Sequence, residues 1–580
     1  METMQINRKR APQKAALIAG LAVSLVLILI SSILLYIFYP YASNEKKAYV
    51  RSGHPILYHG KLQGNAIMEN GTAYVPVSII QKNIDPSLFE DSDSHSVVLT
   101  TKNKVIHFPD SSLEYYINDK EVKLHFPAAK SAGGEQYIAL DPLLELYGIR
   151  YRELKETGIL LIEKNGDTIK QATVKNQEAR KAFLRLREKP DLQSPYYQEV
   201  AQGEKVVVEN ETDGFLFVRK ENGTAGYIQK DYINIGNVQS IMISQKENEW
   251  AMPKSPYPIQ LAWEAVYSKN PDVTSLPSMT GVNIVSPTWF HLINGTGEVD
   301  NMGSNEYVNW AEKNQKQIWG VFTNSFDPQL THEAFSNYEK RQAVIRQLLH
   351  YSKMYRLSGI NLDIENVDVA DKAYVTQFTR EAAARFHQAG LIVSMDVTFL
   401  SSSGNWSQFY DRKELAKSVD YLMVMAYDEH WASSQTAGSV ASLPWVEQNL
   451  QNLLEQVPNE KIVLGVPLYT RLWKETTDSS GAAQMTSEAL KMQTAQKWMA
   501  ERSLSPKYDP ETGQNFVQYT DPKEKAIYRM WLEDETSLQK RVELADKYQL
   551  AGIAAWARIF ADDKAWTAMN SSMTAFYPKK

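Results

Sequence analysis

The strongest constraint on the fold is an alternation of short apolar runs with amphipathic stretches between residues 255 and 580. Stretches such as YEKRQAVIRQLLHYSKMYR have helical spacing, and the apolar runs have the length of buried strands. A repeated strand–helix order predicts a parallel sheet, because each parallel connection has to cross back along the sheet. The strand candidates begin near residues 281, 317, 359, 391, 421, 461 and 551.

The length of this region indicates a (β/α)8 barrel of the TIM type, for which about 250 residues are typical. The interval between the strands near residues 461 and 551 is far too long for one helix, so we expect an α+β insertion at about residues 474–535. The predicted fold class is multidomain: an α/β barrel over residues 255–580, two small mainly-β domains before it, and one N-terminal transmembrane helix.

The strand candidate GINLDIEN holds the most informative polar residues. Residues two apart share a face of a strand, so Asn361, Asp363 and Glu365 point one way and the apolar residues between them the other. Polar groups at the C-terminal end of a barrel strand indicate a catalytic site. The alternative interpretation is a strand end whose acids are merely exposed to solvent. The two carboxyl groups would lie about 6.5 Å apart, near enough for one to raise the pKa of the other. A glutamic acid kept protonated in this way can donate to a leaving-group oxygen.

Composition excludes several other kinds of site. The 580 residues contain no cysteine, which excludes disulfides, thiolate metal sites and a cysteine nucleophile. A formal net charge of −6 argues against a nucleic-acid partner. The sequence has no HExxH motif, no P-loop and no GxGxxG motif before a helix, so we expect no metal and no cofactor.

An uncharged run extends from Ala15 to Ser43, long enough for the ~20 residues that cross a bilayer. Basic residues precede the run and tyrosines close it, which favours a helix with its N-terminus inside the cell. We expect a cytoplasmic tail (1–14), a signal anchor (15–41) and an extracellular remainder, so that the protein is a single-pass protein of the cell membrane. A cleaved signal peptide is the alternative, but its apolar core would be only ~7–15 residues long.

Residues 48–170 form the first predicted β domain. The segment GTAYVPVSIIQKNI is echoed by EQYIALDPLLELYGI, and each copy is followed by a short β-branched run. A hairpin turn is predicted at Asn118–Asp119. The pattern resembles the copper amine oxidase N-terminal-like domain, a small repeat module whose name implies no copper chemistry here. We expect this domain to act as a stalk.

Residues 176–237 form the second predicted β domain, a succession of short strands containing LREKP, GEKV and GTAGYI. This combination resembles a bacterial Src-homology-type-3 domain, although Phe215 or Phe217 stands where that family commonly has tryptophan. The resemblance implies a cell-wall peptide as a partner. A plain spacer that holds the next domain off the membrane is the alternative.

Four segments of the C-terminal region, in order, resemble family 18 glycoside hydrolases. SGINLDIE (358–365) lines up with the family's DGxDxDxE strand, and MVMAYDEHW (423–431) with its MxYD motif. GVPLYTRLW (465–473) resembles the seventh strand, and the tryptophan of AGIAAWARI (551–559) the ring under the reactive sugar. Details such as SPTWF and YRMWLEDETS resemble the bacterial branch that acts on peptidoglycan and spore cortex.

The resemblance implies roles for individual residues. Glu365 is implied as the general acid and later the base, Asp363 as the partner that holds the substrate's acetamido N–H, and Tyr427 as a donor to the acetamido oxygen. The implied mechanism is substrate-assisted with retention, an exception to the two-carboxylate rule. Residues implied or expected to contact the sugar are Asn361, Met425, Asp428, Trp556, Trp289, Trp431 and Asn324.

Two positions depart from the family pattern. Ser358 and Asn361 stand where the family has its first and second aspartates. Asn361 can hydrogen-bond Asp363 but cannot carry a charge, so we expect a changed pH optimum or a slower turnover. The acid at position 365 is present, which favours an enzyme.

These observations predict a membrane-anchored extracellular glycosidase that cuts beside N-acetylglucosamine in peptidoglycan. A chitinase or chitooligosaccharide hydrolase is one alternative, and a non-catalytic protein that binds cell-wall glycan is the other. All 13 tryptophans lie at or after Trp250, which marks the start of the barrel. Only a minority of these rings should meet substrate, since Trp263, Trp310, Trp498 and Trp566 lie in or near helical stretches and are expected in the core.

Overall fold

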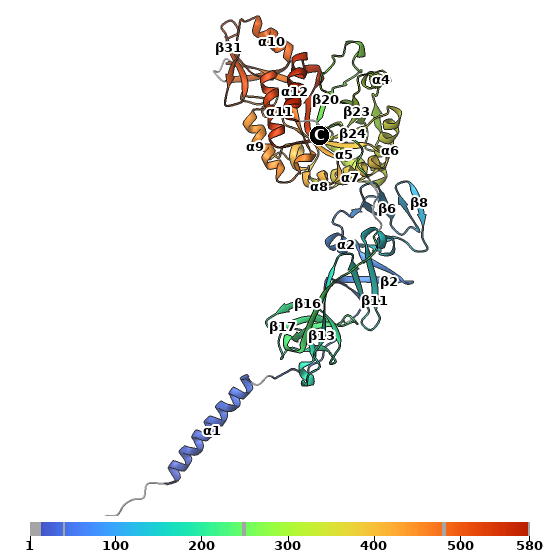
Figure 1. The fold of residues 1–580 in the computed structure, drawn as a ribbon, viewed down its shortest axis with the longest axis vertical. Coiled ribbons are helices and arrows are strands. Elements are labelled where there is room, and N and C mark those ends of the chain that lie inside the picture. The colour runs from blue at the N-terminus through green and yellow to red at the C-terminus, as the bar shows by residue number, and fades with distance from the viewer. Residues whose placement is uncertain (1–12, 39–40, 51, 246–250, 478–482, 578–580) are drawn as a thin grey trace, which may run out of the picture. The chain divides into compact units, whose positions relative to one another are not determined.

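The computed structural model describes residues 13–38, 41–50, 52–245, 251–477 and 483–577. The chain divides into two compact units: residues 1–84 with 137–246, and residues 85–136 with 247–580. Figure 1 shows the helices and strands of each unit. Each unit is described by itself below.

The N-terminal apolar run forms helix α1 (Gln13–Phe38). Its segment Leu17–Leu35 has a mean hydropathy of 2.8 over 19 residues, long and apolar enough to cross a membrane, although a signal sequence has the same properties. The expected basic tail, with Arg8, Lys9 and Arg10, lies outside the described residues. The signal anchor therefore stays a prediction.

The first unit contains two sheets. One carries, in spatial order, β11 (Ile149–Leu154), β12 (Ile159–Lys164), β1 (His54–Tyr58), β2 (Lys61–Glu69), β3 (Thr72–Pro76) and β10 (Glu135–Ala139). The two copies of the sequence repeat take one form, a strand followed by a short helix: β3 leads into α2 (Val77–Asn83) and β10 into α3 (Leu144–Tyr147). The copies meet where Tyr74 pairs with Ala139.

The second sheet of this unit has the order β15-β14-β18-β17-β16-β13-β19 and buries a small apolar core that includes Leu186, Leu216 and Ile228. It begins before the expected boundary at residue 176, because β13 joins it. Its strands are β13 (Thr168–Val174), β14 (Arg185–Arg187), β15 (Tyr196–Glu199), β16 (Lys205–Thr212), β17 (Phe215–Arg219), β18 (Ala225–Gln229) and β19 (Ile233–Ser240).

The C-terminal unit contains the predicted eight-stranded parallel barrel, which closes where β20 pairs with both β21 and β33. The strands are β20 (Ile259–Glu264), β21 (Ile284–Leu292), β23 (Gln317–Thr323), β24 (Gly359–Asp363), β25 (Ile392–Thr398), β26 (Tyr421–Met425), β27 (Ile462–Pro467) and β33 (Gly552–Trp556). The sequence analysis identified all of them except β20. β20 is as fully buried as β24 and β27, but Gln260 interrupts its apolar run and Glu264 ends it, so the sequence shows no continuous apolar segment there.

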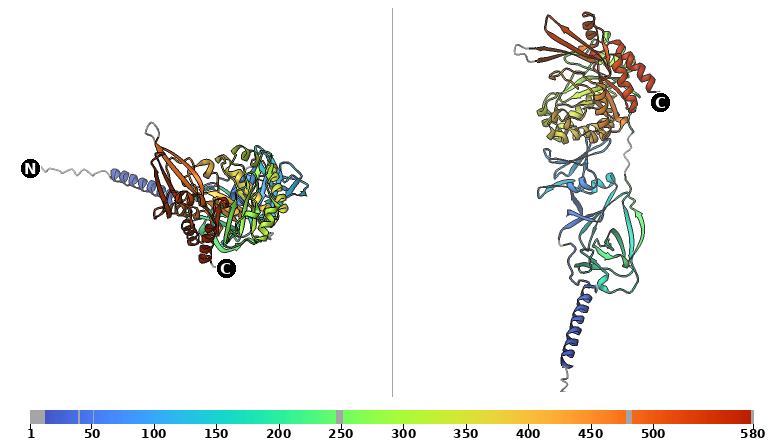
Figure 2. Two further views of the ribbon diagram at one scale, coloured as in Figure 1. Left: turned by 90° about the horizontal axis from the view of Figure 1, so that it is seen from above. Right: turned by 90° about the vertical axis from the view of Figure 1, so that its left-hand side faces the viewer.

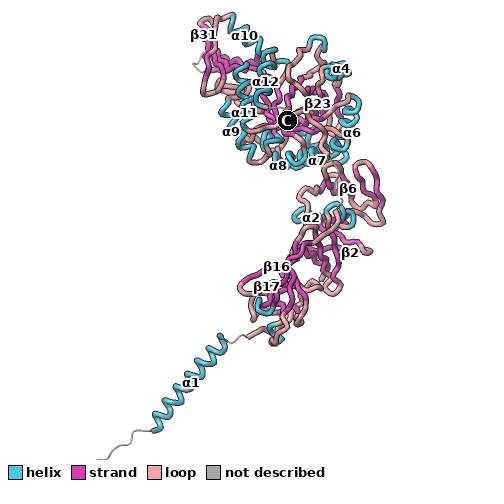
Figure 3. Tube along the Cα trace, in the orientation of Figure 1, coloured by secondary structure: helices cyan, strands magenta, loops and turns pink. Residues whose placement is uncertain are grey.

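Helices surround the barrel strands (Figures 1 and 3). The outward face of β24, with Ile360 and Leu362, packs in the core between strands and helices, as the alternation in GINLDIEN predicts. The helices are α4 (Asn305–Lys313), α5 (Pro328–Phe335), α6 (Tyr338–Met354), α7 (Lys372–Gln388), α8 (Arg412–Ser418), α9 (Leu443–Leu454), α11 (Glu535–Lys547) and α12 (Asp563–Phe576).

An α+β insertion separates β27 from α11, as expected (Figure 2). It starts at residue 469, a few residues earlier than predicted, and its sheet has the order β29-β28-β32-β31-β30. Its elements are β28 (Tyr469–Thr477), β29 (Ala483–Lys491), α10 (Met492–Ala500), β30 (Lys507–Asp509), β31 (Gln514–Asp521) and β32 (Ala526–Leu532).

A small antiparallel sheet, β4 to β8, belongs to the same compact unit as the barrel, although the sequence analysis assigned it to the 48–170 domain. Arg341 of α6 explains the grouping, because it is fully buried and pairs with Asp91 of β4 at 2.7 Å and with Glu381 of α7 at 2.9 Å. The His107 ring also stacks on Tyr338, 3.7 Å between centroids. The strands are β4 (Phe89–Asp91), β5 (Ser96–Thr100), β6 (Val105–Pro109), β7 (Glu114–Ile117) and β8 (Lys120–Lys123).

Candidate active site

The candidate acids lie at the C-terminal end of β24. Asn361 and Asp363 are on its interior face, 0% and 8% exposed, and Glu365 follows two residues after the strand ends. Glu365 is half-buried, so one part of its side chain remains open to solvent. Barrel enzymes have their active sites at this end of the strands.

The backbone around Glu365 is held by two buried side chains. The Asn324 side chain donates to the Glu365 carbonyl oxygen at 2.7 Å and accepts from its N–H at 3.0 Å. The Tyr410 hydroxyl donates to the carbonyl oxygen of Ile364 at 2.7 Å. Asn324 is fully buried, so it does not contact sugar directly as the sequence analysis expected. It supports the acid instead.

Asn361 has different partners from those expected. Its Nδ2 donates to Asp396 Oδ1 of the neighbouring strand β25 at 2.8 Å, and its Oδ1 accepts from Trp263 Nε1 at 2.9 Å. The amide is therefore engaged with Asp396 and Trp263, not with Asp363, to which it could also have donated. Asp363 Oδ1 is buried and has no hydrogen-bond partner among the described residues.

Three carboxyl groups titrate abnormally inside this end of the barrel. Burial raises the pKa of Asp363 to about 7. Burial, and next the charge of Asp363, raise the pKa of Glu365 well above its usual value. Burial, and next the charge of Asp363, also raise the pKa of Asp396 well above its usual value. The raised pKa favours the protonated form of Glu365, which is the state that a general acid requires.

The segment after β26 brings a phenol and a further acid toward Glu365. Burial, and then the charges of Asp396 and Glu365, raise the pKa of Tyr427 well above its usual value, so its hydroxyl stays a donor. Asp428 has a positive φ of 60°, and its Oδ1 accepts from the Tyr469 hydroxyl at 2.6 Å. Its charge contributes to the raised pKa of Glu365. Met425 ends β26 and is half-buried.

The three tryptophans predicted to meet sugar have different surroundings. Trp556 ends β33, is half-buried and lies 6.0 Å from Trp263 between ring centroids. Trp431 is 58% exposed in the loop after β26. Trp289 is 0% exposed, donates to Asn270 at 2.7 Å and packs on Tyr307, so it is a core residue and the expectation of a sugar contact is wrong.

The alternation in SMDVT indicates that Asp396 faces the barrel with Ser394, with packing or support of other residues as an equal alternative to substrate contact, and both side chains are buried on β25. Sequence reasoning missed other residues at this end of the barrel. Trp263 was expected near a helix but lies on β20 and supports Asn361. Trp406, 46% exposed in the short helical segment η6 (Gly404–Gln408) after β25, carried no signal of its own.

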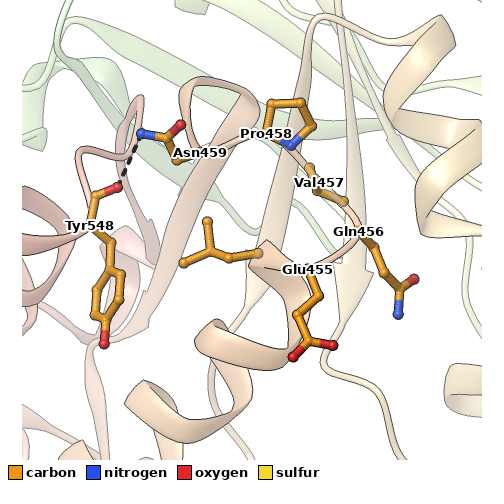
Figure 4. A pocket seen from close by; sticks show the side chains of 7 residues that line it. Glu455, Gln456, Val457, Pro458, Asn459 and Tyr548 are labelled. Atoms are coloured by element: carbon orange, nitrogen blue, oxygen red, sulfur yellow. Dashed lines mark hydrogen bonds between the residues drawn. The ribbon is translucent and has the colours of Figure 1, made fainter.

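A hollow in the described part of the chain lies at the opposite end of the barrel from these acids. This hollow, of about 540 Å³, is lined by residues 454–459 and Tyr548 (Figure 4). It lies where the chain enters β27, at the N-terminal end of a strand, and the interaction drawn there is the bond from Asn459 to the Tyr548 carbonyl oxygen at 3.2 Å. Within the described parts of the chain, no group of three or more His, Asp or Glu residues is arranged to hold a metal ion.

Comparison with known families agrees with this geometry. Residues 323–561 match the family Glycosyl hydrolases family 18, and residues 58–150 match the Copper amine oxidase N-terminal domain. Both resemblances stated from the sequence are thereby confirmed. The Src-homology-type-3 resemblance of residues 176–237 stays a prediction.

Individual relatives are distant. The chain is 26% identical over 283 residues to the uncharacterized glycosylase YvbX of Bacillus subtilis, covering 47% of this chain and 80% of that protein. It is 24% identical over 268 residues to the cortical fragment-lytic enzyme of Bacillus subtilis, covering 45% of this chain and 61% of that enzyme. A chitinase structure from Chromobacterium violaceum aligns with a TM-score of 0.48 at 23% identity, covering 54% of this chain and 98% of that one.

Proposed function

We propose that this chain, a glycoside hydrolase with a family 18 domain, hydrolyses the bond beside N-acetylglucosamine in peptidoglycan. The observation that carries the proposal is the pair Asp363 and Glu365, held at the C-terminal end of β24 with pKa values raised by burial. Such a pair supplies one acid that keeps its proton and one that ionises near neutral pH. Resemblance of the chain to a cortical fragment-lytic enzyme favours peptidoglycan as the source of the sugar.

In the proposed reaction, Glu365 gives its proton to the glycosidic oxygen as the bond from that oxygen to the anomeric carbon breaks. The acetamido carbonyl oxygen of the same sugar forms a bond to the anomeric carbon, which gives a cyclic oxazolinium ion. Ionised Asp363 accepts a hydrogen bond from the acetamido N–H and offsets the positive charge. The Tyr427 hydroxyl donates to the acetamido oxygen and orients it.

The second half of the reaction restores the enzyme. Glu365, now ionised, takes a proton from a water molecule as that water attacks the anomeric carbon. The bond between the acetamido oxygen and the anomeric carbon breaks, and the configuration at that carbon is retained. Trp556, at the end of β33, would stack its face on the sugar, and Met425, Asp428 and Trp431 would complete the sugar site.

The remaining parts of the proposal concern location. Helix α1 would anchor the chain in the cell membrane with both compact units outside, and the sheet of residues 168–240 would bind a cell-wall peptide. The family 18 match covers residues 323–561, so the residues before it are available for such targeting functions. Chitin is the second candidate substrate, because the chain is 24% identical over 275 residues to a class V chitinase of Lotus japonicus.

The test uses the full chain in detergent. Wild type and Glu365→Gln are incubated with purified peptidoglycan and with chitin oligosaccharides, and the new reducing ends are counted. Glu306→Gln, which changes an exposed acid on α4, is the matched control. We expect cleavage by wild type and by the control and none by Glu365→Gln. Mass spectra of the products identify the sugar at the new reducing end, which should be N-acetylglucosamine. N-acetylmuramic acid at that end would contradict the proposal, and so would equal activity of all variants.

A further inference from the structure

Asp396 lies beside Asp363 within the barrel. The paired register of β24 and β25 runs from Gly359 opposite Ile392 to Leu362 opposite Met395, so the next pair is Asp363 with Asp396. Paired residues of neighbouring strands point to the same side of a sheet, about 4.8 Å apart. Both side chains are nearly inaccessible to solvent, 8% and 3% exposed.

The hydrogen bonds around the two acids are unequal. Asp396 Oδ1 accepts from Asn361 Nδ2 at 2.8 Å, and Asn361 is itself fixed by Trp263 Nε1. Asp363 Oδ1 is buried and has no donor among the described residues. A buried carboxylate oxygen without a donor is costly, so the site requires a proton that can be placed between these acids.

We propose that Asp396 is a third carboxyl group of the active site, which keeps its proton and donates it in a hydrogen bond to ionised Asp363. The proton stays on Asp396 in this arrangement. Oδ1 of Asp396 accepts the hydrogen bond from Asn361, and the protonated Oδ2 donates to Asp363. Asp396 is thus a positioning residue for the charge on Asp363. This inference rests on the proposed function, in which Asp363 has to be charged.

The surroundings favour a neutral Asp396. The groups that face it are Asp363 and Glu365 from the end of β24, Tyr427 from the segment after β26 and Tyr410 from the segment after η6. The cation Arg412 lies beyond Tyr410, 5.2 Å from that ring, and donates to the carbonyl oxygens of Thr398 and Ser407. The negative charges of Asp363 and Glu365 favour the protonated form of the buried Asp396.

The first experiment compares Asp396→Ala with Asp396→Asn in the full chain, using the pH dependence of kcat/KM. The asparagine amide can still accept from Asn361 and donate to Asp363, whereas alanine can do neither. We expect Asp396→Ala to move the acidic limb upward by about one pH unit, a tenfold loss below that limb, and Asp396→Asn to leave the limb near its wild-type position. Ser394→Ala, which removes a buried hydroxyl from the same face of β25, is the matched control.

The second experiment does not depend on activity. Infrared difference spectra at neutral pH record the C=O band of protonated carboxyl groups, and Asp396→Asn should remove one such band from the wild-type spectrum. An unchanged band would show that Asp396 is ionised and would overturn the inference. So would an equal shift of the acidic limb in the alanine and asparagine variants, since that would assign the effect to a charge at position 396. If no glycan is cleaved, the proposed function fails while the infrared result still decides the state of Asp396.

Discussion

Asn324 and Glu365 are joined through the main chain: the Asn324 amide accepts from the Glu365 N–H at 3.0 Å and donates to the Glu365 carbonyl oxygen at 2.7 Å. The two residues follow neighbouring barrel strands, β23 and β24. A third bond, from Asn324 Nδ2 to the Thr331 hydroxyl at 2.8 Å, fixes the amide itself. The position of the proposed acid is therefore determined by a residue that has no exposed surface.

Replacing Asn324 by alanine should lower kcat with little change in KM. The Glu365 backbone would lose both partners, and a small displacement of a reacting group can cost up to about 100-fold in rate. Steady-state kinetics on peptidoglycan fragments measure both constants. Thr331→Val, which keeps Asn324 but removes one of its acceptors, should have a smaller effect in the same direction. A raised KM at an unchanged kcat would instead assign Asn324 to sugar binding.

The rate should depend on pH with two limbs. The acidic limb reports ionisation of Asp363, whose pKa is raised to about 7, and the alkaline limb reports loss of the Glu365 proton. The Asp363→Asn variant should lose the acidic limb together with most of its activity. A profile of kcat/KM that is flat from pH 5 to pH 8 would contradict this assignment of the two acids.

Asp363, because it is buried, should lower the stability of the folded protein at neutral pH. A carboxyl group whose folded pKa is above its unfolded value binds its proton more tightly in the folded state, so stability falls as pH rises between about 4 and 7. Asp363→Asn should therefore raise the free energy of unfolding by about 1–4 kcal/mol at pH 7 and by much less at pH 4. Tryptophan fluorescence can follow the transition, because all 13 tryptophans lie at or after Trp250. If Asp363→Asn is less stable than wild type at pH 7, the prediction is wrong.

The buried ion pair of Arg341 should matter for the C-terminal unit. Arg341→Met leaves Asp91 and Glu381 buried without their cation, and breaking a buried pair typically costs about 3–5 kcal/mol. Arg356→Met is the matched control, because its partner Glu312 is half exposed and such surface pairs contribute about 0–1 kcal/mol. Denaturant unfolding, again read by tryptophan fluorescence, measures both. Equal losses in the two variants would show that the buried ion pair contributes no more to stability than a surface pair.

The effect of replacing a tryptophan should depend on how deeply its ring is buried. Trp289→Ala removes a fully buried ring and should destabilise the barrel by about 3–5 kcal/mol. Trp431→Ala removes a ring that is 58% exposed, so it should leave stability nearly unchanged and raise KM for long glycans. Thermal unfolding and steady-state kinetics on the two variants test this division. An unchanged KM for Trp431→Ala would remove that ring from the sugar site.

Much of the fold and part of the site were accessible from local patterns. The alternation in GINLDIEN placed Ile360 and Leu362 outside the barrel and Asn361 and Asp363 inside, since the period of a strand decides which face a side chain takes. Seven of the barrel strands were found from their short apolar runs. The eighth, β20, was missed because the polar residues Gln260 and Glu264 break its apolar run, although both are buried in the fold.

The class of the C-terminal domain and the acids on one strand can be read from local patterns, because strand period, element order and motif spacing are local properties of the chain. Which residues surround those acids depends on contacts made in the folded barrel. Asp396 reaches Asn361 across 35 positions of sequence, Trp263 across 98, and Asn324 reaches Glu365 across 41. Such contacts depend on strand register and barrel closure, which bring distant side chains to one level of the barrel and bury Trp289 while leaving Trp431 exposed.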